Sequence, residues 1–182
     1  MTLYKTVLAD PPWNEQGGGR IRRGADRHYN LMSKEEIIDY MRKVSIAEDA
    51  HLYLWVTNNH LTEGLEVMHA LGFKYVTNIA WVKDRIGLGQ YFRGQHELCL
   101  FGTKGKQPYK TGTAGRSCCT EPSVIFANRT EHSKKPEAMY AKIENTSYPP
   151  FVELFARQRR SGWDSVGNQL EPYTQQRMEK FK

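Results

Sequence analysis

The stretch Thr6-Val-Leu-Ala-Asp-Pro-Pro-Trp13 passes from a short apolar run into a charged turn that contains two prolines. The apolar run, 6–9, predicts a brief buried strand that ends where Asp10 begins the turn. In open α/β sheets, ligands bind beyond the carboxyl ends of the strands, so we expect Asp10 at a binding edge. Without further context, Asp-Pro-Pro is about as typical of a plain turn as of a site.

Outward from this stretch, apolar runs alternate with helical patterns. The further expected strands are 52–56, 76–82, 97–101, 123–127, 151–155 and 162–167. The run 52–56 is almost continuously apolar, which is typical of a strand covered on both faces. Strands that alternate with helices predict an α/β fold with a mostly parallel sheet.

Three helices are expected between these strands. Ser33 and Glu36 form a capping box at the start of helix 33–44. Asn58 is the expected cap of a second helix, which stops at Gly72. A third helix is expected over 135–145 with Pro136 in its first turn. A peripheral helix is expected in the polar tail from 171.

The composition is that of one folded domain, 1–182. Hydrophobic residues make up 39% and charged residues 25% of the 182 residues, which excludes a disordered chain. No apolar stretch approaches the ~20 residues that span a bilayer, and no export signal is visible, so we expect a cytoplasmic protein without a membrane partner. Three cysteines and scattered histidines indicate neither a disulfide framework nor a metal site.

Two basic loops interrupt the pattern, at about 14–32 and 103–121. The net charge of +6 is compatible with a polyanionic partner, and its distribution is more informative than its total. The first loop carries Arg20, Arg22, Arg23 and Arg27, and the second carries Lys104, Lys106, Lys110 and Arg116. Long stretches without periodicity inside a compact domain are usually functional or disordered.

Several motifs follow one another in a recognisable order. They are Leu8-Ala-Asp-Pro-Pro-Trp13, His28-Tyr29-Asn-Leu-Met-Ser33, Leu54-Trp-Val-Thr-Asn58, Gln95-His-Glu-Leu98, Phe101-Gly102-Thr103, Ser133-Lys-Lys-Pro136, Glu153-Leu-Phe-Ala-Arg157, Gly162-Trp163 and Gly167-Asn-Gln169. In these motifs the chain resembles the DPPW-motif adenine-N6 methyltransferases (the MT-A70 family), in a compact bacterial or phage form.

The resemblance implies a fold and an activity. The fold is a Rossmann-like S-adenosylmethionine-dependent methyltransferase fold, α/β with helices flanking the sheet, in permuted order: the catalytic strand comes first and the cofactor strand near the C-terminus. The activity is transfer of a methyl group from S-adenosylmethionine to the exocyclic N6 amine of adenine in DNA. The catalytic residues by this resemblance are Asp10, Pro11, Pro12 and Trp13.

The turn at Asp10 suits this chemistry. The adenine amine is a poor nucleophile because its lone pair is delocalised into the ring. The Asp10 carboxylate and the Pro11 carbonyl can each accept one N–H, which aims the lone pair and stabilises the developing positive charge. Trp13 is expected to stack on or flank a flipped base.

The resemblance also implies cofactor-binding residues, which are Asp10, Lys135, Glu153, Arg157, Arg159, Asn168 and Gln169. Lys135 would meet the methionine carboxylate, and the amides of Asn168 and Gln169 would contact the ribose. Without the resemblance, Lys135 would be a solvated lysine at a helix start, and Asn168 and Gln169 would belong to a plain turn after glycine. For Glu153 a role without function is harder to accept, because a carboxylate inside an apolar strand needs a partner.

Substrate contacts are expected in the first basic loop. Tyr29 matches an aromatic residue that holds the target base, with ordinary packing as the alternative, and the four loop arginines are expected on phosphates. Two departures stand out. Arg159 and Arg160 occupy positions where some relatives have histidine and asparagine, and no residue matches the acidic one that holds the cofactor adenine.

Three alternatives stay open at this point. The first is the same reaction on RNA, and the second is a non-catalytic nucleic-acid-binding subunit, against which the intact Asp10 argues. Exocyclic cytosine is the third, but aspartate rather than serine at the start of the motif favours adenine. The expected partner is nucleic acid, with DNA favoured in a bacterial or phage-infected cell, and a second copy of the chain is left open.

Overall fold

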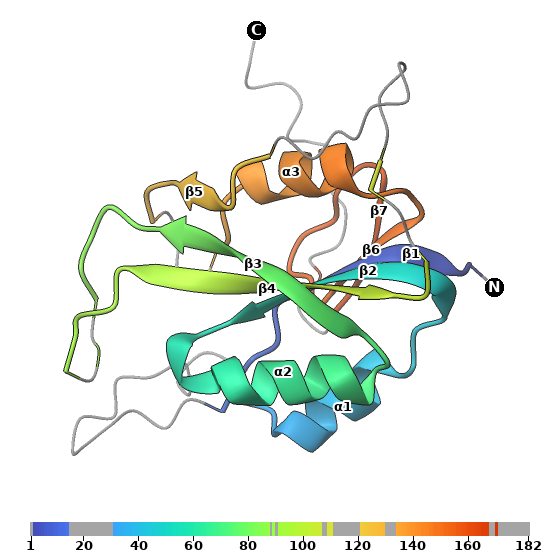
Figure 1. Ribbon diagram of the computed structural model, residues 1–182, viewed down its shortest axis with the longest axis horizontal. Coiled ribbons are helices and arrows are strands. Elements are labelled where there is room, and N and C mark those ends of the chain that lie inside the picture. Colours follow the sequence, from blue (N-terminus) through green and yellow to red (C-terminus); the bar gives the residue numbers. More distant parts are fainter. Residues whose placement is uncertain are drawn as a thin grey trace, which may run out of the picture.

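The computed structural model describes residues 2–14, 31–87, 89, 91–106, 109–110, 121–129, 134–167 and 170. In this part of the chain, a seven-stranded sheet has the order β5-β3-β4-β2-β1-β6-β7 (Figure 1). β4 runs antiparallel to its neighbours β2 and β3, and the other pairings are parallel. The predicted Rossmann-like α/β fold with a mostly parallel sheet is confirmed.

The predicted strands are all present, with some shifted ends. Their bounds are β1 Tyr4–Ala9, β2 Ile46–Val56, β3 Lys74–Val82, β4 His96–Lys104, β5 Val124–Phe126, β6 Phe151–Leu154 and β7 Trp163–Val166. β2 begins at Ile46, before the predicted start at 52. The prediction missed these first residues because the exposed Glu48 and Asp49 interrupt the apolar pattern. β4 extends to Lys104, so the second basic loop begins later than the predicted 103.

The three helices are α1 Lys34–Met41, α2 Leu61–Ala70 and α3 Ala138–Thr146. The capping box of α1 is confirmed, since Ser33 and Glu36 bond each other's backbone N–H. The predicted cap at Asn58 is wrong: Asn58 lies in a 3-10 turn that His60 closes by bonding Thr57. The last predicted segment, from 171, lies outside the described residues.

The start of α3 also differs from the prediction. The helix begins at Ala138 rather than at the predicted 135. Pro136 lies before the helix, and its carbonyl accepts the N–H of Met139 at 3.0 Å. Lys135 therefore lies in the segment before the helix instead of on its solvated first turn. Gly72, by contrast, ends α2 as predicted, with a φ of +80° that favours glycine.

The helices cover both faces of the sheet. α1 and α2 lie on one face and α3 on the other (Figure 1). Val7 and Ala9 of β1 belong to the core on the α1–α2 face, and Leu8 belongs to the core beneath α3. Because side chains alternate along a strand, Asp10 follows Leu8 onto the α3 face.

In the described part of the chain, no helix has the length and apolarity needed to cross a membrane.

Candidate active site

The site is built around the carboxyl end of β1. Ala9, the last residue of this strand, pairs with Leu54 of β2 on one side and with Leu154 of β6 on the other. Asp10 therefore leaves the sheet between two parallel neighbours that end at the same edge. This is the kind of edge at which α/β proteins bind their ligands.

The turn after Asp10 is held by its own backbone. The N–H of Trp13 donates to the carbonyl of Pro11 at 2.9 Å, and the carbonyl of Pro12 accepts from Met32 at 2.9 Å. The first bond closes a three-residue turn, in which the fixed φ of proline restricts the chain further. The Asp-Pro-Pro segment is thus a constrained turn that fixes where the Asp10 side chain starts.

Trp13 anchors this turn in the core. Its side chain is 5% exposed, its indole N–H donates to the carbonyl of Trp55 at 2.8 Å, and its ring stacks on His60 with centroids 5.5 Å apart. The expectation that this ring stacks on or flanks a flipped base stays a prediction. In the structure its faces are already covered, because the indole packs inward from the turn.

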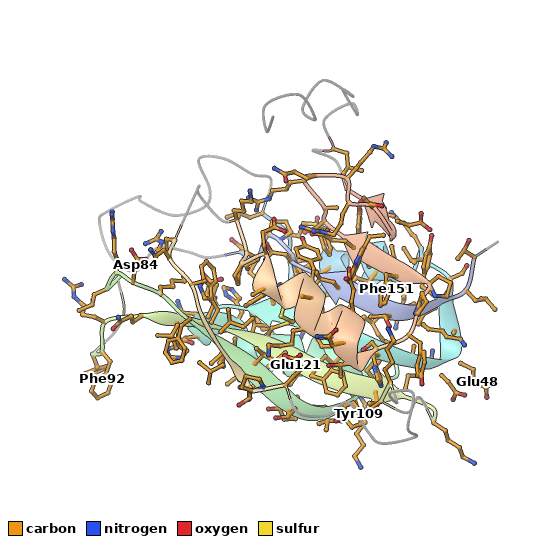
Figure 2. All side chains as sticks on the ribbon, turned by 90° about the horizontal axis from the view of Figure 1, so that it is seen from above. Glu48, Asp84, Phe92, Tyr109, Glu121 and Phe151 are labelled. Carbon is orange, nitrogen blue, oxygen red and sulfur yellow. The ribbon has the colours of Figure 1, made fainter. Side chains whose placement is uncertain are left out.

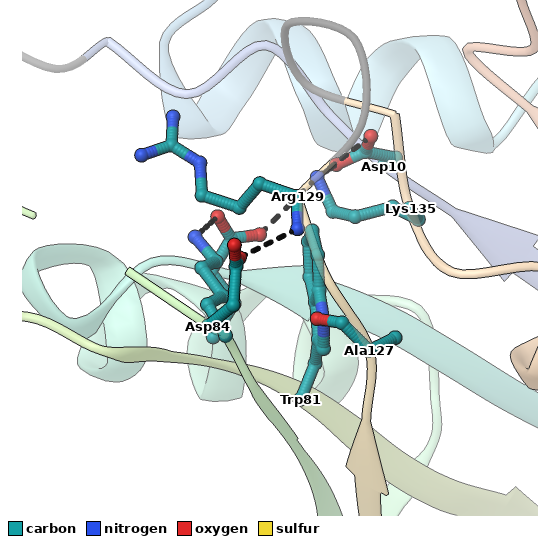
Figure 3. A network of polar contacts seen from close by, with 8 residues as sticks. Asp10, Trp81, Asp84, Ala127, Arg129 and Lys135 are labelled. Carbon is teal, nitrogen blue, oxygen red and sulfur yellow. Dashed lines mark hydrogen bonds and ion pairs between the residues drawn. The ribbon is translucent and has the colours of Figure 1, made fainter. Parts of the chain in front are cut away.

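Lys135 reaches the Asp10 carboxylate from the segment before α3 (Figure 3). Its ammonium lies 2.8 Å and 2.9 Å from the two carboxylate oxygens, and the side chains are 16% and 21% exposed. The ammonium also lies 5.5 Å from the centroid of the Trp55 ring. Two of the residues singled out from the sequence thus meet across 125 positions of chain.

Glu97 is a second acid on this lysine. Its carboxylate lies 3.4 Å from the Lys135 ammonium and pairs with Lys83 as well. Burial works against the ionised carboxyl, but Lys135 and Lys83 outweigh it and hold the pKa of Glu97 below its ordinary value. Burial likewise opposes the charge of Lys135, and Asp10 and Glu97 outweigh it and raise its pKa.

Glu153 lies on β6 opposite Leu8, on the face that carries α3. Its carboxylate accepts a hydrogen bond from the Tyr140 hydroxyl at 2.9 Å. Burial raises the pKa of the Glu153 carboxyl, and the charge of Asp10 adds to the effect. Burial and the neighbouring Glu153 also raise the pKa of the Tyr140 phenol well above its usual range. The tyrosine therefore acts as a hydrogen-bond donor that fixes Glu153.

The three arginines after β6 differ in placement. Arg157 is half-buried and Arg159 is exposed. Arg160 lies against α3: its guanidinium carbon is 3.6 Å from the centroid of the Tyr140 ring, and it pairs with Glu137. Of the two positions that depart from the family pattern, 159 and 160, the second therefore packs beside Tyr140.

Other predicted site residues lie outside the described residues, namely Arg20, Arg22, Arg23, Arg27, Tyr29, Asn168 and Gln169. The residue before Asn168 is described. A Cβ on Gly167 would overlap the carbonyl oxygen of Ala156, and the Ala156 N–H bonds the carbonyl of Val166. Glycine at 167 thus lets the segments after β6 and β7 approach each other closely.

The sequence reasoning missed the roles of Glu97, Lys83 and Tyr140. Glu97 was quoted within Gln95-His-Glu-Leu98, but only as part of a motif. β4 is antiparallel, so its first residues lie at the edge where β1 ends. The signal that identifies Glu97 is the direction of its strand, which the apolar pattern does not reveal.

A mixed α/β sheet with this charged site at its carboxyl edge is a Rossmann-like methyltransferase fold. The chain matches the family described as MT-A70 over residues 4–169, and it belongs to that family. MT-A70 methyltransferases use S-adenosylmethionine as the methyl donor. The residues present fit this group, since a largely buried ammonium can meet its carboxylate, and the Asp10 and Glu153 carboxylates can meet its ammonium and hydroxyl groups.

Curated relatives include proteins of very different length. The chain is 34% identical to an N(6)-adenosine-methyltransferase MT-A70-like protein of Arabidopsis thaliana, over 92% of this chain and 24% of the relative. It is 31% identical to the human N(6)-adenosine-methyltransferase catalytic subunit METTL3, over 92% and 28%. It is 26% identical to the type II methyltransferase M.MunI of a Mycoplasma species, over 98% and 85%. The chain thus spans about a quarter of the length of the first two.

Proposed function

We propose that this protein transfers a methyl group from S-adenosylmethionine to the N6 amine of adenine in nucleic acid, and that DNA is its substrate. The observation that carries the proposal is the Asp10–Lys135 pair at the carboxyl end of β1, in a chain that belongs to the MT-A70 family. The family supplies the reaction class, and the site supplies the groups that the reaction needs.

Asp10 and Pro11 are assigned to the target amine. The Asp10 carboxylate accepts one N–H, and the Pro11 carbonyl accepts the other through the lone pair that Trp13 leaves unused. The bound donor presents an electrophilic methyl group on a sulfonium. Two acceptors on a constrained turn would orient the amine lone pair and stabilise the positive charge that develops on nitrogen.

Lys135 and Glu153 are assigned to the donor. Lys135 binds the methionine carboxylate while keeping contact with Asp10, because an ammonium has three N–H donors. Glu153, fixed by Tyr140, accepts from hydroxyl groups at the end of β6. Arg157, Arg159, Asn168 and Gln169 are retained as contacts of the same group on the strength of the sequence motifs.

The choice of DNA rests on how much of each relative's length this chain covers. The type II methyltransferase is matched over 85% of its length, and this match favours DNA. The N(6)-adenosine-methyltransferases favour RNA, which is therefore the second candidate substrate. The expected phosphate contacts, Arg20, Arg22, Arg23 and Arg27, suit either polymer.

One assay tests the reaction and the substrate together. The protein is incubated with S-adenosylmethionine and with unmethylated plasmid DNA or RNA, and the digested nucleosides are analysed by mass spectrometry. We expect N6-methyladenine from DNA, and a loss of about 100-fold or more in Asp10→Ala, since removing one group that stabilises transition-state charge typically costs that much. Asp39→Asn, which changes an exposed carboxylate on α1, is the matched control.

Each other result contradicts one part of the proposal. No N6-methyladenine on either polymer, with cofactor binding shown by calorimetry, contradicts the reaction and favours the non-catalytic alternative. Methylation confined to RNA contradicts the substrate. Turnover of Asp10→Ala within a few-fold of the unaltered protein contradicts the role given to Asp10.

A further inference from the structure

The indole of Trp13 is covered by a second ring, that of His60 just before α2. The two ring centroids lie 5.5 Å apart and the ring planes differ by 22°, so the rings are stacked. His60 is 8% exposed, although an apolar side chain could fill the same space without removing ring nitrogens from water. A histidine buried at this place therefore needs polar partners within the protein.

Both nitrogens of the His60 ring have such partners. Nδ1 lies 3.0 Å from the hydroxyl oxygen of Thr57, the residue that follows β2, and Nε2 lies 3.5 Å from the carboxylate of Glu63 in the first turn of α2. The backbone N–H of His60 also donates to the Thr57 carbonyl at 3.0 Å. Figure 1 shows how directly the end of β2 leads into α2. These contacts fix the plane of the imidazole, so the ring presents one orientation to Trp13.

Trp13 in turn holds the segment that contains the two prolines. Its indole N–H donates to the carbonyl of Trp55 at 2.8 Å, and its backbone N–H donates to the carbonyl of Pro11 at 2.9 Å. The position of Trp13 therefore affects the direction of the Pro11 carbonyl, which is one of the two acceptors assigned to the target amine. An error of about 1 Å in the placement of a reacting group can lower a rate about 100-fold.

His60 acts on the opposite face of the sheet from the groups assigned to the methyl donor. Trp13 belongs to the core on the α1–α2 face, whereas Glu153 lies on the face that carries α3. Figure 2 looks down onto α3, so the sheet lies between the viewer and α2. The removal of the His60 ring should therefore leave the donor groups in place and act on the turn.

We propose that His60 is a positioning residue for methyl transfer, which acts through Trp13 to direct the Pro11 carbonyl at the target amine. This inference rests on the proposed function, because it needs an exocyclic amine at Pro11. The stacked imidazole restrains one face of the indole while the Trp55 carbonyl restrains its edge, so the turn keeps one conformation. Its loss should appear in kcat, because His60 acts on the turn and not on the groups assigned to the donor.

The test measures kcat and KM for the methylation of plasmid DNA or RNA, and the Kd of S-adenosylmethionine by calorimetry. In His60→Ala, kcat is expected to fall about tenfold while KM and Kd stay within about twofold, because the Trp55 carbonyl still holds part of the indole. His60→Phe, which keeps a stacked ring but loses the polar partners, is expected to lose about threefold in kcat. His69→Ala changes an exposed histidine in the last turn of the same helix and is the matched control.

Ser147→Ala controls for a general loss of stability. It removes a buried, hydrogen-bonded hydroxyl on the α3 face and should leave kcat unchanged. If His60→Ala does not fold, His60→Phe carries the test, and a kcat equal to that of the unaltered protein overturns the inference.

The outcomes separate this inference from the proposed function. A kcat of folded His60→Ala within about twofold of an active unaltered protein overturns the inference alone. A raised KM or a weaker Kd with unchanged kcat assigns His60 to binding and also overturns it. An equal loss of kcat in Ser147→Ala attributes the effect to stability, with the same consequence. No methylation of either polymer by the unaltered protein overturns the proposed function, and the inference with it.

Discussion

Two polar networks lie on the α3 face of the sheet, and they differ in charge and exposure. The charged network consists of Lys83, Glu97, Lys135 and Asp10 at the carboxyl edge. The neutral network consists of His51, Tyr53 and Ser147, in which the serine hydroxyl shares hydrogen bonds with the His51 ring at 2.7 Å and the Tyr53 hydroxyl at 2.8 Å. All three neutral residues are at most 2% exposed.

The comparison separates a network that stabilises the fold from one whose members can change partners when a ligand binds. Fully buried groups that are hydrogen-bonded to one another join the end of α3 to β2. Charged groups are costly to bury, so a largely buried lysine held by two carboxylates suits a place where a ligand replaces one of these partners. The two networks should therefore respond differently to the removal of one member.

The largest expected effect follows from the loss of Lys135. Lys135→Met keeps much of the length and apolar contact of the side chain but removes the cation that we assign to the methionine carboxylate. Hydrogen bonds to charged groups contribute about 1.5–3 kcal/mol, so S-adenosylmethionine should bind about 10- to 100-fold more weakly by calorimetry. Lys34→Met, which removes a lysine paired with Glu66 on the other face, should leave the affinity unchanged. An affinity equal in both variants would contradict the assignment.

A smaller effect of the opposite kind is expected at Ser147. Ser147→Ala takes one hydrogen-bond partner from each of His51 and Tyr53 in a buried place, which should lower the free energy of unfolding by about 1–3 kcal/mol. The measurement is urea unfolding, with Ser165→Ala as the control at a less buried serine. Cofactor affinity should stay within twofold. If instead the affinity falls and the stability does not, the neutral network belongs to the site.

The smallest effect is a pH dependence that comes from Glu97. Its pKa is depressed in the folded state, so its contribution to stability is present above its ordinary value of 4.5 and is lost as the pH falls through the depressed value. The raised pKa of Lys135 works at the other end, since its contribution is present below 10.5 and is lost as the pH rises through the raised value. Between these limits the charged network is complete.

Glu97→Gln tests this directly. The variant should be less stable than the unaltered protein at neutral pH, and the difference should shrink as the pH falls below about 4.5. Thermal unfolding at a series of pH values measures it, with Glu66→Gln as the exposed control. A difference that stays constant into acid would mean that the Glu97 carboxylate does not stabilise the fold through its charge.

The local sequence pattern predicts the helices and strands of this molecule well. The apolar run before Asp10, the capping box at Ser33 and the stop at Gly72 depend on neighbouring residues, and each is found where it was expected. The boundary at 135 was missed because proline is equally at home in the first turn of a helix and just before it. The partner that Lys135 finds just before this helix is 125 residues away and does not show in the local pattern.

The chemistry of the site was predicted less completely, for a related reason. Asp10 and Lys135 were both singled out because they belong to family motifs, but their contact with each other was not predicted. Glu97 enters the site through the direction of β4. Trp13 was assigned to a base because aromatic rings stack, but its exposure of 5% is a tertiary property. The type of residue determines which contacts a side chain can make, and packing decides which of them it makes.

The reversed direction of β4 also affects how such a protein can change over generations. Parallel neighbours need a long crossover between them, but an antiparallel pair needs only a hairpin, and the length of a surface loop has a small free-energy cost. Residues 84–95 can therefore be lengthened or shortened without moving a strand of the sheet, provided that Lys83 keeps its contact with Glu97. The fold thus places a loop of variable length next to the charged network, and this loop can change while the turn at Asp10 keeps its contacts.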